Sequence, residues 1–255
     1  MLDAALENNV QAIWLAFGNN IGQWVNYIRE KNQRDGQKTL VFVQVNSLAE
    51  ALVAVNEWKT DVLIAQGIES GGHGGGYAPS VFSLVSSILA ALPKHGPPLL
   101  AAGGLATGAQ VASFLTLGAA GAALGTRFLL TPDSLYSVPQ KAALLAADSN
   151  STVRTLAFDR ARNTLGWPQG IDGRGLRNEI VQDVEDGTDI SIVRKKFAER
   201  AQSGEPSYTI VWAGTGVGEM HEIKGAQQIV QEFHQEILER VQASQGLVGD
   251  SETQI

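Results

Sequence analysis

The sequence predicts an α/β protein built on a parallel β-sheet, and two patterns along the chain lead to this prediction. Between residues 11 and 134, short apolar segments alternate with longer segments whose apolar residues recur at helical spacing. Three successive apolar segments are followed by glycine-rich turns. The carboxyl ends of parallel strands lie at one edge of a sheet, where connecting loops commonly carry ligands. We therefore expect consecutive strand–helix units with a ligand site at that edge.

Five strands and the helices between them can be placed by composition and by capping signals. The expected strands cover residues 12–17, 40–45, 61–65, 99–102 and 121–124. Helices are expected over residues 21–34 and 80–92. Two more helices should begin at Ser47 and Thr107, because Glu50 and Gln110 complete capping-box patterns with them.

The regular alternation fades after residue 135, so the chain is divided into four parts. Residues 10–135 hold the five strand–helix units, and residues 136–206 are expected to form a mostly helical insert or lid, with an irregular connection at 167–174. Residues 207–243 should return to the sheet through a short strand at 208–212 and a long amphipathic helix at 223–241. Residues 244–255 are polar and are expected to form a flexible tail.

Composition limits the classes of function. The length of 255 residues fits one large α/β domain. The net charge of −7 and the lack of a basic cluster argue against nucleic acid and anionic membranes as partners. The absence of cysteine removes disulfides, thiolate metal sites and cysteine nucleophiles. With no secretory signal pattern at the N-terminus and no apolar span, the expectation is a cytoplasmic protein that acts on a small molecule.

A histidine inside a glycine cluster is the first candidate site. Five of the six residues from Gly71 to Gly76 are glycine, and the sixth is His73. Glycine lets a backbone approach a flat ring or an anion closely, and histidine can titrate near neutral pH. His73 is thus a candidate general base at the end of the third strand. The alternative is a flexible surface loop with an incidental histidine.

Two further glycine turns follow the fourth and fifth strands. Gly103 and Gly104 close the fourth strand, and Gly125 and Thr126 follow the fifth. Backbone N–H groups at such turns, with the threonine hydroxyl, can bind a phosphate. The alternative for either turn alone is a glycine required by helix–strand packing. Other motifs fail, since no dinucleotide-binding glycine pattern, P-loop or complete zinc motif is present, and no metal is expected.

Together these segments resemble the nitronate monooxygenases, formerly called 2-nitropropane dioxygenases. The residues that carry the resemblance are the segments AQG-x-E-S-GGH-x-G, AAGGL-x-x-G, LGTRF and TPDS. The later segments GWPQGIDGRGLRN and WAGTGVG are similar to those of fungal-type members. The likeness extends over residues 12–241, which is most of the chain.

The resemblance implies an FMN-binding (β/α)8 barrel of the TIM type that oxidises alkyl nitronates or nitroalkanes with O2 to a carbonyl compound and nitrite. It implies that His73 is the catalytic base. It implies that the following residues bind the nucleotide cofactor: Gln66, Gly71, Gly103, Gly104, Ala123, Leu124, Gly125 and Thr126.

The chain also departs from the pattern of this family. No segment before residue 12 matches the first three strand–helix units, so an incomplete barrel is expected, with a second copy or a partner chain over its open edges. Gly74 stands where a basic residue is frequent, and Thr107 where aspartate is usual. Two alternatives stay open. One is an FMN- and NAD(P)H-dependent enoyl reductase on the same barrel, and the other is an inactive truncated homologue that acts as a binding or assembly partner.

Overall fold

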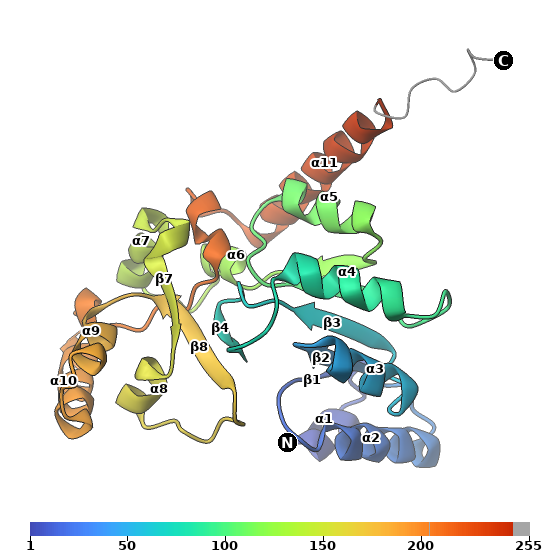
Figure 1. Ribbon diagram of the computed structural model, residues 1–255, viewed down its shortest axis with the longest axis horizontal. Helices are drawn as coiled ribbons and strands as arrows, with labels where there is room; N and C mark the ends of the chain where they lie inside the picture. Colours follow the sequence, from blue (N-terminus) through green and yellow to red (C-terminus); the bar gives the residue numbers. More distant parts are fainter. Residues whose placement is uncertain (204, 247–255) are drawn as a thin grey trace.

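The computed structural model describes residues 1–203 and 205–246, and it contains two β-sheets with helices around them (Figure 1). The parallel sheet contains β1 (Ala12–Leu15), β2 (Leu40–Val45), β3 (Val62–Gln66), β5 (Leu99–Ala102) and β6 (Gly121–Ala123), in the order β1-β2-β3-β5-β6. The antiparallel sheet contains β4 (Gly72–Gly75), β7 (Thr152–Thr155) and β8 (Ile171–Leu176), in the order β4-β8-β7. The prediction of an α/β fold on a parallel sheet is confirmed.

The helices alternate with the strands in the first half of the chain and predominate in the second half. The α-helices are α1 (Leu2–Glu7), α2 (Ile21–Asp35), α3 (Leu48–Asn56), α4 (Val81–Ala91), α5 (Gly108–Leu117), α6 (Thr126–Leu129), α7 (Val138–Ala146), α8 (Ala157–Arg162), α9 (Glu179–Glu185), α10 (Ile190–Ser203) and α11 (Ala226–Gln245). Short 3₁₀-helices are η1 (Ser149–Ser151), η2 (Pro206–Tyr208) and η3 (Thr215–Glu219). The helix α1 was not expected from the sequence.

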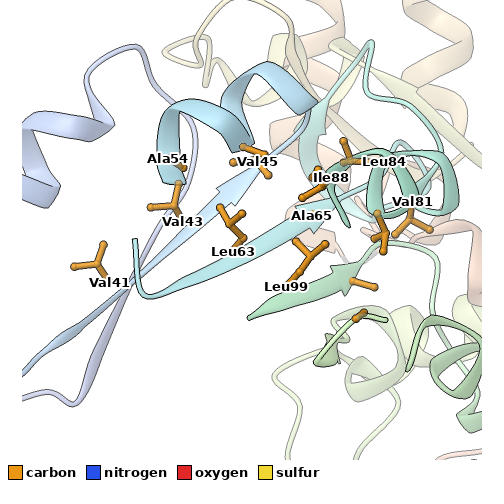
Figure 2. Close-up of a cluster of buried hydrophobic side chains, with 14 of the residues drawn as sticks. Val41, Val43, Val45, Ala54, Leu63, Ala65, Val81, Leu84, Ile88 and Leu99 are labelled. Atoms are coloured by element: carbon orange, nitrogen blue, oxygen red, sulfur yellow. The ribbon is translucent and has the colours of Figure 1, made fainter. Parts of the chain in front are cut away.

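Alternate residues of the parallel strands divide between two faces. Val41, Val43 and Val45 of β2 point to the same side as Leu63 and Leu99, and Figure 2 shows them packed with side chains of α3 and α4. This set forms the main hydrophobic core. Full burial of such a side chain stabilises the fold by about 1.5–3 kcal/mol relative to exposure.

The capping signals begin their helices as predicted. The Ser47 hydroxyl accepts a hydrogen bond from the Glu50 N–H, and Thr107 with Gln110 forms a complete capping box at α5. These caps fix where the chain turns from the end of a strand into a helix, so they also set the length of the turns that line the site. Among the described residues, none of the helices has the length and apolar character needed to cross a membrane.

The opposite face of the parallel sheet carries fewer covering elements. Trp14 on β1 is 48% exposed and Leu40 on β2 is 44% exposed. β1 and β6 are the edge strands of the described sheet, and each has a parallel partner on one side. The five predicted strand–helix units are thus present as an open sheet in the described residues.

The structure differs from the expectations for the glycine cluster and for residues 167–174. Instead of a loop and an irregular connection, residues 72–75 form β4 and pair with β8 in an antiparallel register in which His73 faces Gly173. Glycine-rich segments lack the alternation of apolar residues that marks a strand, so sequence patterns missed both. The small residues are needed because a Cβ at Gly173 would lie 2.4 Å from the Trp212 ring.

The second half of the chain forms a separate cluster of buried side chains around the antiparallel sheet. Phe158 of α8, Ile180 of α9, Val193 of α10 and Tyr208 are buried together. The short strand expected at 208–212 is absent from the described residues, where η2 and a single bridge between Gly175 and Trp212 take its place. Figure 1 shows this unit beside the parallel sheet, with β4 and β8 between α8 and β3.

Helix α11 packs along α5 and ends the described chain. The carboxylate of Glu236 accepts a hydrogen bond of 2.7 Å from the Gly108 N–H at the start of α5. A Cβ at Gly108 would lie 2.6 Å from the Phe233 carbonyl oxygen, so glycine allows this close approach of two helices. The helix continues to Gln245, past the beginning of the expected tail, and residues 247–255 of that tail lie outside the described residues.

Candidate functional site

A cavity of about 230 Å³ lies at the carboxyl ends of the parallel strands. All eight residues expected to bind a cofactor line it, although they come from three separate strand ends. The residues of its wall are Trp14, Gln44, Gln66, Ser70, Gly71, Ala102, Gly103, Gly104, Leu105, Ala123, Leu124, Gly125 and Thr126. The parallel order of β3, β5 and β6 explains this meeting, because adjacent strands end at the same edge of the sheet.

The turn after β5 needs glycine at both positions. Gly103 has φ +108° and Gly104 has φ +71°, in the left-handed region that side chains with a Cβ rarely adopt. A Cβ at Gly104 would also lie 2.8 Å from the Glu69 Cβ and 2.9 Å from the Thr215 hydroxyl oxygen. Both crowding and backbone conformation therefore keep the amides of this turn at the cavity wall.

The turn after β6 leaves open space. A Cβ added at Gly125 would meet no atom within 4 Å, and its φ of −108° is outside the left-handed region that favours glycine. Beside it, the Thr126 hydroxyl accepts a hydrogen bond of 3.0 Å from the Gly214 N–H. The hydroxyl proton of Thr126 can still be donated to a ligand.

Gly71 holds the first loop against the segment that contains Gly214. A Cβ at Gly71 would lie 2.4 Å from the Gly214 backbone nitrogen and 2.9 Å from the Thr126 hydroxyl oxygen. The contact joins the end of β3, the turn after β6 and the segment 213–215. Glu69 strengthens the same loop, because its carboxylate accepts a hydrogen bond of 2.9 Å from the Val81 N–H at the start of α4.

Two glutamines lie on the face of the sheet opposite Val43 and Leu63, and they give the cavity a polar end. The Gln66 Oε1 accepts a hydrogen bond of 3.1 Å from the Asn46 side chain, and its Nε2 donates one of 3.3 Å to the His73 carbonyl oxygen. The neighbouring Gln44 is buried, and its Nε2 has no hydrogen-bond partner among the described residues. An unpaired buried donor costs about 1–3 kcal/mol, so a ligand with an acceptor near this end would stabilise the protein.

His73 is held by three neighbours that come from the second half of the chain. Its Nε2 lies 3.0 Å from each carboxylate oxygen of Asp159, and the Asp159 side chain is 0% exposed. The Trp167 ring stacks on the imidazole with 3.8 Å between centroids and an interplanar angle of 18°. The Trp212 ring lies tilted at 5.1 Å. Only 13% of the His73 side chain is exposed, so it is no incidental surface histidine.

His73 is not one of the described residues that form the wall of the 230 Å³ cavity. It is joined to that wall through Gln66, whose side chain lines the cavity and bonds to the His73 backbone. Asp159, Trp167 and Gln44 were not predicted as residues of the site. Asp159 follows His73 by 86 residues and lies on a short helix, and no spacing rule connects the two.

Two arginines of the antiparallel sheet donate hydrogen bonds to the backbone of the loop between β3 and β4. Arg154 of β7 donates to the Ser70 carbonyl oxygen at 2.7 Å and pairs with Asp172 at 3.0 Å. Arg174 of β8 donates to the Ile68 carbonyl oxygen at 3.2 Å. Burial lowers the pKa of Arg174 from its usual value, and the nearby positive charge of Arg154 lowers it further. These bonds fix the backbone between β3 and β4, so the second unit sets the shape of the predicted glycine loop.

A second cavity of about 380 Å³ lies beside the first, at the ends of β1 and β2. Gln44 lines both cavities. The wall of the second is mostly apolar and includes Phe17, Val45, Val53, Trp58 and Ile171. The Phe17 ring meets Trp167 edge-on at 5.9 Å, and Trp167 in turn covers His73.

Gly173→Ala tests whether the pairing of β4 with β8 depends on a small residue behind Trp212. The added methyl would lie 2.4 and 2.7 Å from two atoms of the Trp212 ring, and the Phe158 ring packs edge-on against that ring at 5.3 Å. We expect a loss of about 1–3 kcal/mol in the free energy of unfolding, measured by denaturant titration. Gly166→Ala, which meets no atom within 4 Å, is the control and should stay near the wild-type value.

The chain is similar to the proteins of one known family over most of its length. The family model described as "Nitronate monooxygenase" matches residues 2–236. A nitronate monooxygenase of Metarhizium robertsii is 35% identical over 245 residues, covering 91% of this chain and 67% of that protein. A nitronate monooxygenase of Neurospora crassa is 33% identical over 214 residues, covering 81% of this chain and 56% of that protein. The chain thus spans between about half and two thirds of the length of these relatives.

Solved structures agree on the fold. FabK from Thermotoga maritima has a TM-score of 0.76 at 27% identity, over 96% of this chain and 74% of that one. A nitroalkane oxidase from Streptomyces ansochromogenes also has a TM-score of 0.76 at 27% identity, over 95% of this chain and 68% of that one. The parallel sheet and the antiparallel unit therefore occur together in other proteins of this architecture.

Proposed function

The chain belongs to the nitronate monooxygenase family, and from this membership together with the site we propose that it is an FMN-dependent oxidoreductase that converts alkyl nitronates or nitroalkanes, with O2, into a carbonyl compound and nitrite. The observation that carries the proposal is the convergence of all eight expected cofactor residues on one cavity. The proposal includes a cytoplasmic location and a covering role for residues 136–206, whose Trp167 lies over His73.

The residues of the first cavity fit a flat, phosphate-bearing cofactor. The glycine turns after β5 and β6 bring backbone N–H groups to the wall, and the Thr126 hydroxyl adds a donor. The open space at Gly125 leaves room for an anion, and the unpaired Nε2 of Gln44 matches a carbonyl or ring-nitrogen acceptor. We assign the phosphate to Gly103, Gly104, Gly125 and Thr126, and we assign the polar ring edge to Gln44 and Gln66.

In this proposal each residue has a limited task. The cofactor, when bound, supplies the acceptance of electrons from the substrate and their transfer to O2. His73 removes the α-proton of a neutral nitroalkane, or orients a nitronate that already carries the negative charge. Trp167 covers one face of the imidazole and Trp212 lies at an angle to it, so both limit the access of water to the ring. The apolar cavity beside Gln44 accepts the carbon chain of the substrate.

A visible absorbance spectrum of the purified chain, before and after addition of FMN, tests the cofactor assignment. We expect a bound flavin spectrum with one FMN per chain. A chain that stays colourless and does not take up FMN would contradict the enzymatic proposal, and it would favour the alternative of an inactive homologue that acts as a binding partner.

An FMN- and NAD(P)H-dependent enoyl reductase is the second candidate. The structural similarity to FabK favours it, because that similarity is as high as the one to the nitroalkane oxidase. The two functions differ in their electron donor. We expect that NAD(P)H added without oxygen leaves the visible flavin absorbance unchanged over minutes, whereas an anaerobic alkyl nitronate bleaches it. Rapid bleaching by NAD(P)H would favour the reductase instead.

A further inference from the structure

We propose that Asp159 is the positioning residue of the site and that it makes Nδ1 of His73, rather than Nε2, the atom that accepts the substrate proton. This inference rests on the proposed role of His73 and extends it to one nitrogen of the ring and to one partner. It begins from the pair of 3.0 Å distances between Nε2 and the two carboxylate oxygens of Asp159.

The side chain of Asp159 is an acceptor with a hydrogen-bond donor beside it. The Thr164 hydroxyl donates a hydrogen bond of 2.9 Å to the Asp159 Oδ1. The carboxylate is fully buried, and a buried charge needs partners that compensate for its lost hydration. A neutral imidazole can meet that need only when Nε2 carries the proton and donates it to the carboxylate. The tautomer of His73 is therefore fixed as Nε2–H.

The remaining nitrogen is the one available for chemistry. Within the described residues, Nδ1 of His73 has no hydrogen-bond partner, and it is not one of the unpaired atoms sealed from solvent. Trp167 stacks on one face of the ring and Trp212 lies at an angle to it, so we place the approach of the substrate in the ring plane, towards Nδ1. A carbon acid positioned there would lose its proton to the Nδ1 lone pair.

The proton balance of this step is simple. The C–H bond of the neutral nitroalkane breaks, and its electron pair stays on the substrate as the nitronate anion. The proton forms an N–H bond at Nδ1, so the imidazole becomes an imidazolium with N–H groups on both nitrogens. Asp159 then faces a cation across 3.0 Å, which stabilises the product of proton transfer more than the neutral imidazole.

Asp159→Asn is the main test. Because the Thr164 hydroxyl donates to Oδ1, the NH2 group of the new asparagine would take the place of Oδ2, which lies 3.0 Å from Nε2. Nε2 would then lie beside both an amide oxygen and an NH2 group, so Nε2–H is no longer the one tautomer that residue 159 allows. We expect kcat/KM for nitroethane to fall by about 10²–10⁴-fold, the range of a lost general base or a wrong tautomer. Anionic ethyl nitronate should react within a few-fold of the wild-type rate.

The tautomer can be measured without any turnover. Two-bond ¹H–¹⁵N NMR spectra of the histidine rings, assigned for His73 by comparison with His73→Asn, should show the Nε2–H form in the wild type. In Asp159→Asn the Nδ1–H form should appear beside it, because the amide can donate to Nε2 as well as accept from it. Asp159→Glu keeps the carboxylate, and we expect it to retain the Nε2–H form and part of the nitroethane activity.

Asp183→Asn is the matched control, because Asp183 is a carboxylate of the same unit that bonds to Lys196 and Tyr208 and not to His73. It should change neither the tautomer nor the ratio of nitroethane to nitronate turnover. An Nδ1–H form in the wild type, or an unchanged tautomer in folded Asp159→Asn, would overturn the proposal. If the expected tautomers appear but neither substrate reacts with the wild type, the positioning role stands and the proposed function fails.

Discussion

Replacing His73 with asparagine is expected to lower kcat/KM for neutral nitroalkanes by about 10²–10⁴-fold while the protein keeps its flavin. The imidazole is removed, but its backbone carbonyl, which accepts from Gln66, remains in β4. His73 does not line the cavity assigned to the cofactor, so the substitution leaves the wall of that cavity unchanged. The measurement is steady-state O2 consumption with nitroethane, together with the flavin absorbance of each preparation.

Two comparisons separate loss of a base from general damage. Alkyl nitronates already lack the proton that His73 would remove, so their turnover should fall far less than that of the neutral substrates. His95→Asn changes an exposed histidine on the loop after α4, and it should behave as the wild type does. Equal turnover of nitroethane by His73→Asn and the wild type would remove His73 from the role of base.

The same substitution also tests the environment of the histidine. Asp159 is fully buried and would lose its partner, and a buried carboxylate without compensation is destabilising by roughly 3–5 kcal/mol. The amide of the introduced asparagine can donate to this carboxylate in part, so we expect a smaller loss, visible as a lower midpoint of thermal unfolding. Activity on nitroalkanes must therefore be compared at a temperature at which both proteins are fully folded.

The strand–helix order was predictable because its signals are local. The valines of β2 alternate towards the helices, and the capping pairs at Ser47 and Thr107 begin α3 and α5 as expected. The glycine turns after β5 and β6 were found for the same reason, since they directly follow apolar segments. Neighbouring parallel strands then bring these turns together without further information.

The surroundings of His73 were not predictable in this way. β4 and β8 are rich in glycine, and their pairing depends on Trp212 and on arginines more than 80 residues away from the loop that they hold. Asp159 meets His73 only because β8 pairs with β4 and β7 pairs with β8, which brings α8 to the site. A tertiary contact of this kind has no periodicity in the sequence, so the charge that orients the base appears only in the folded chain.

Gly125→Leu is expected to weaken FMN binding by about 100-fold without unfolding the protein. The φ of Gly125 is negative, outside the left-handed region that favours glycine, and an added Cβ would meet no atom of the chain within 4 Å. The longer side chain would fill the space assigned to the phosphate. Loss of two hydrogen bonds to a charged group, each contributing about 1.5–3 kcal/mol, corresponds to at least this change in affinity.

The control for this substitution is Gly225→Leu. Gly225 also precedes a helix, has a φ of −60° and meets no atom within 4 Å of an added Cβ, but it lines neither of the two cavities. Titration of the flavin-free proteins with FMN, followed by quenching of flavin fluorescence, should give a wild-type Kd for Gly225→Leu and a raised Kd for Gly125→Leu. An unchanged Kd in a folded Gly125→Leu protein would place the phosphate elsewhere, because a filled turn cannot also hold an anion through its backbone amides.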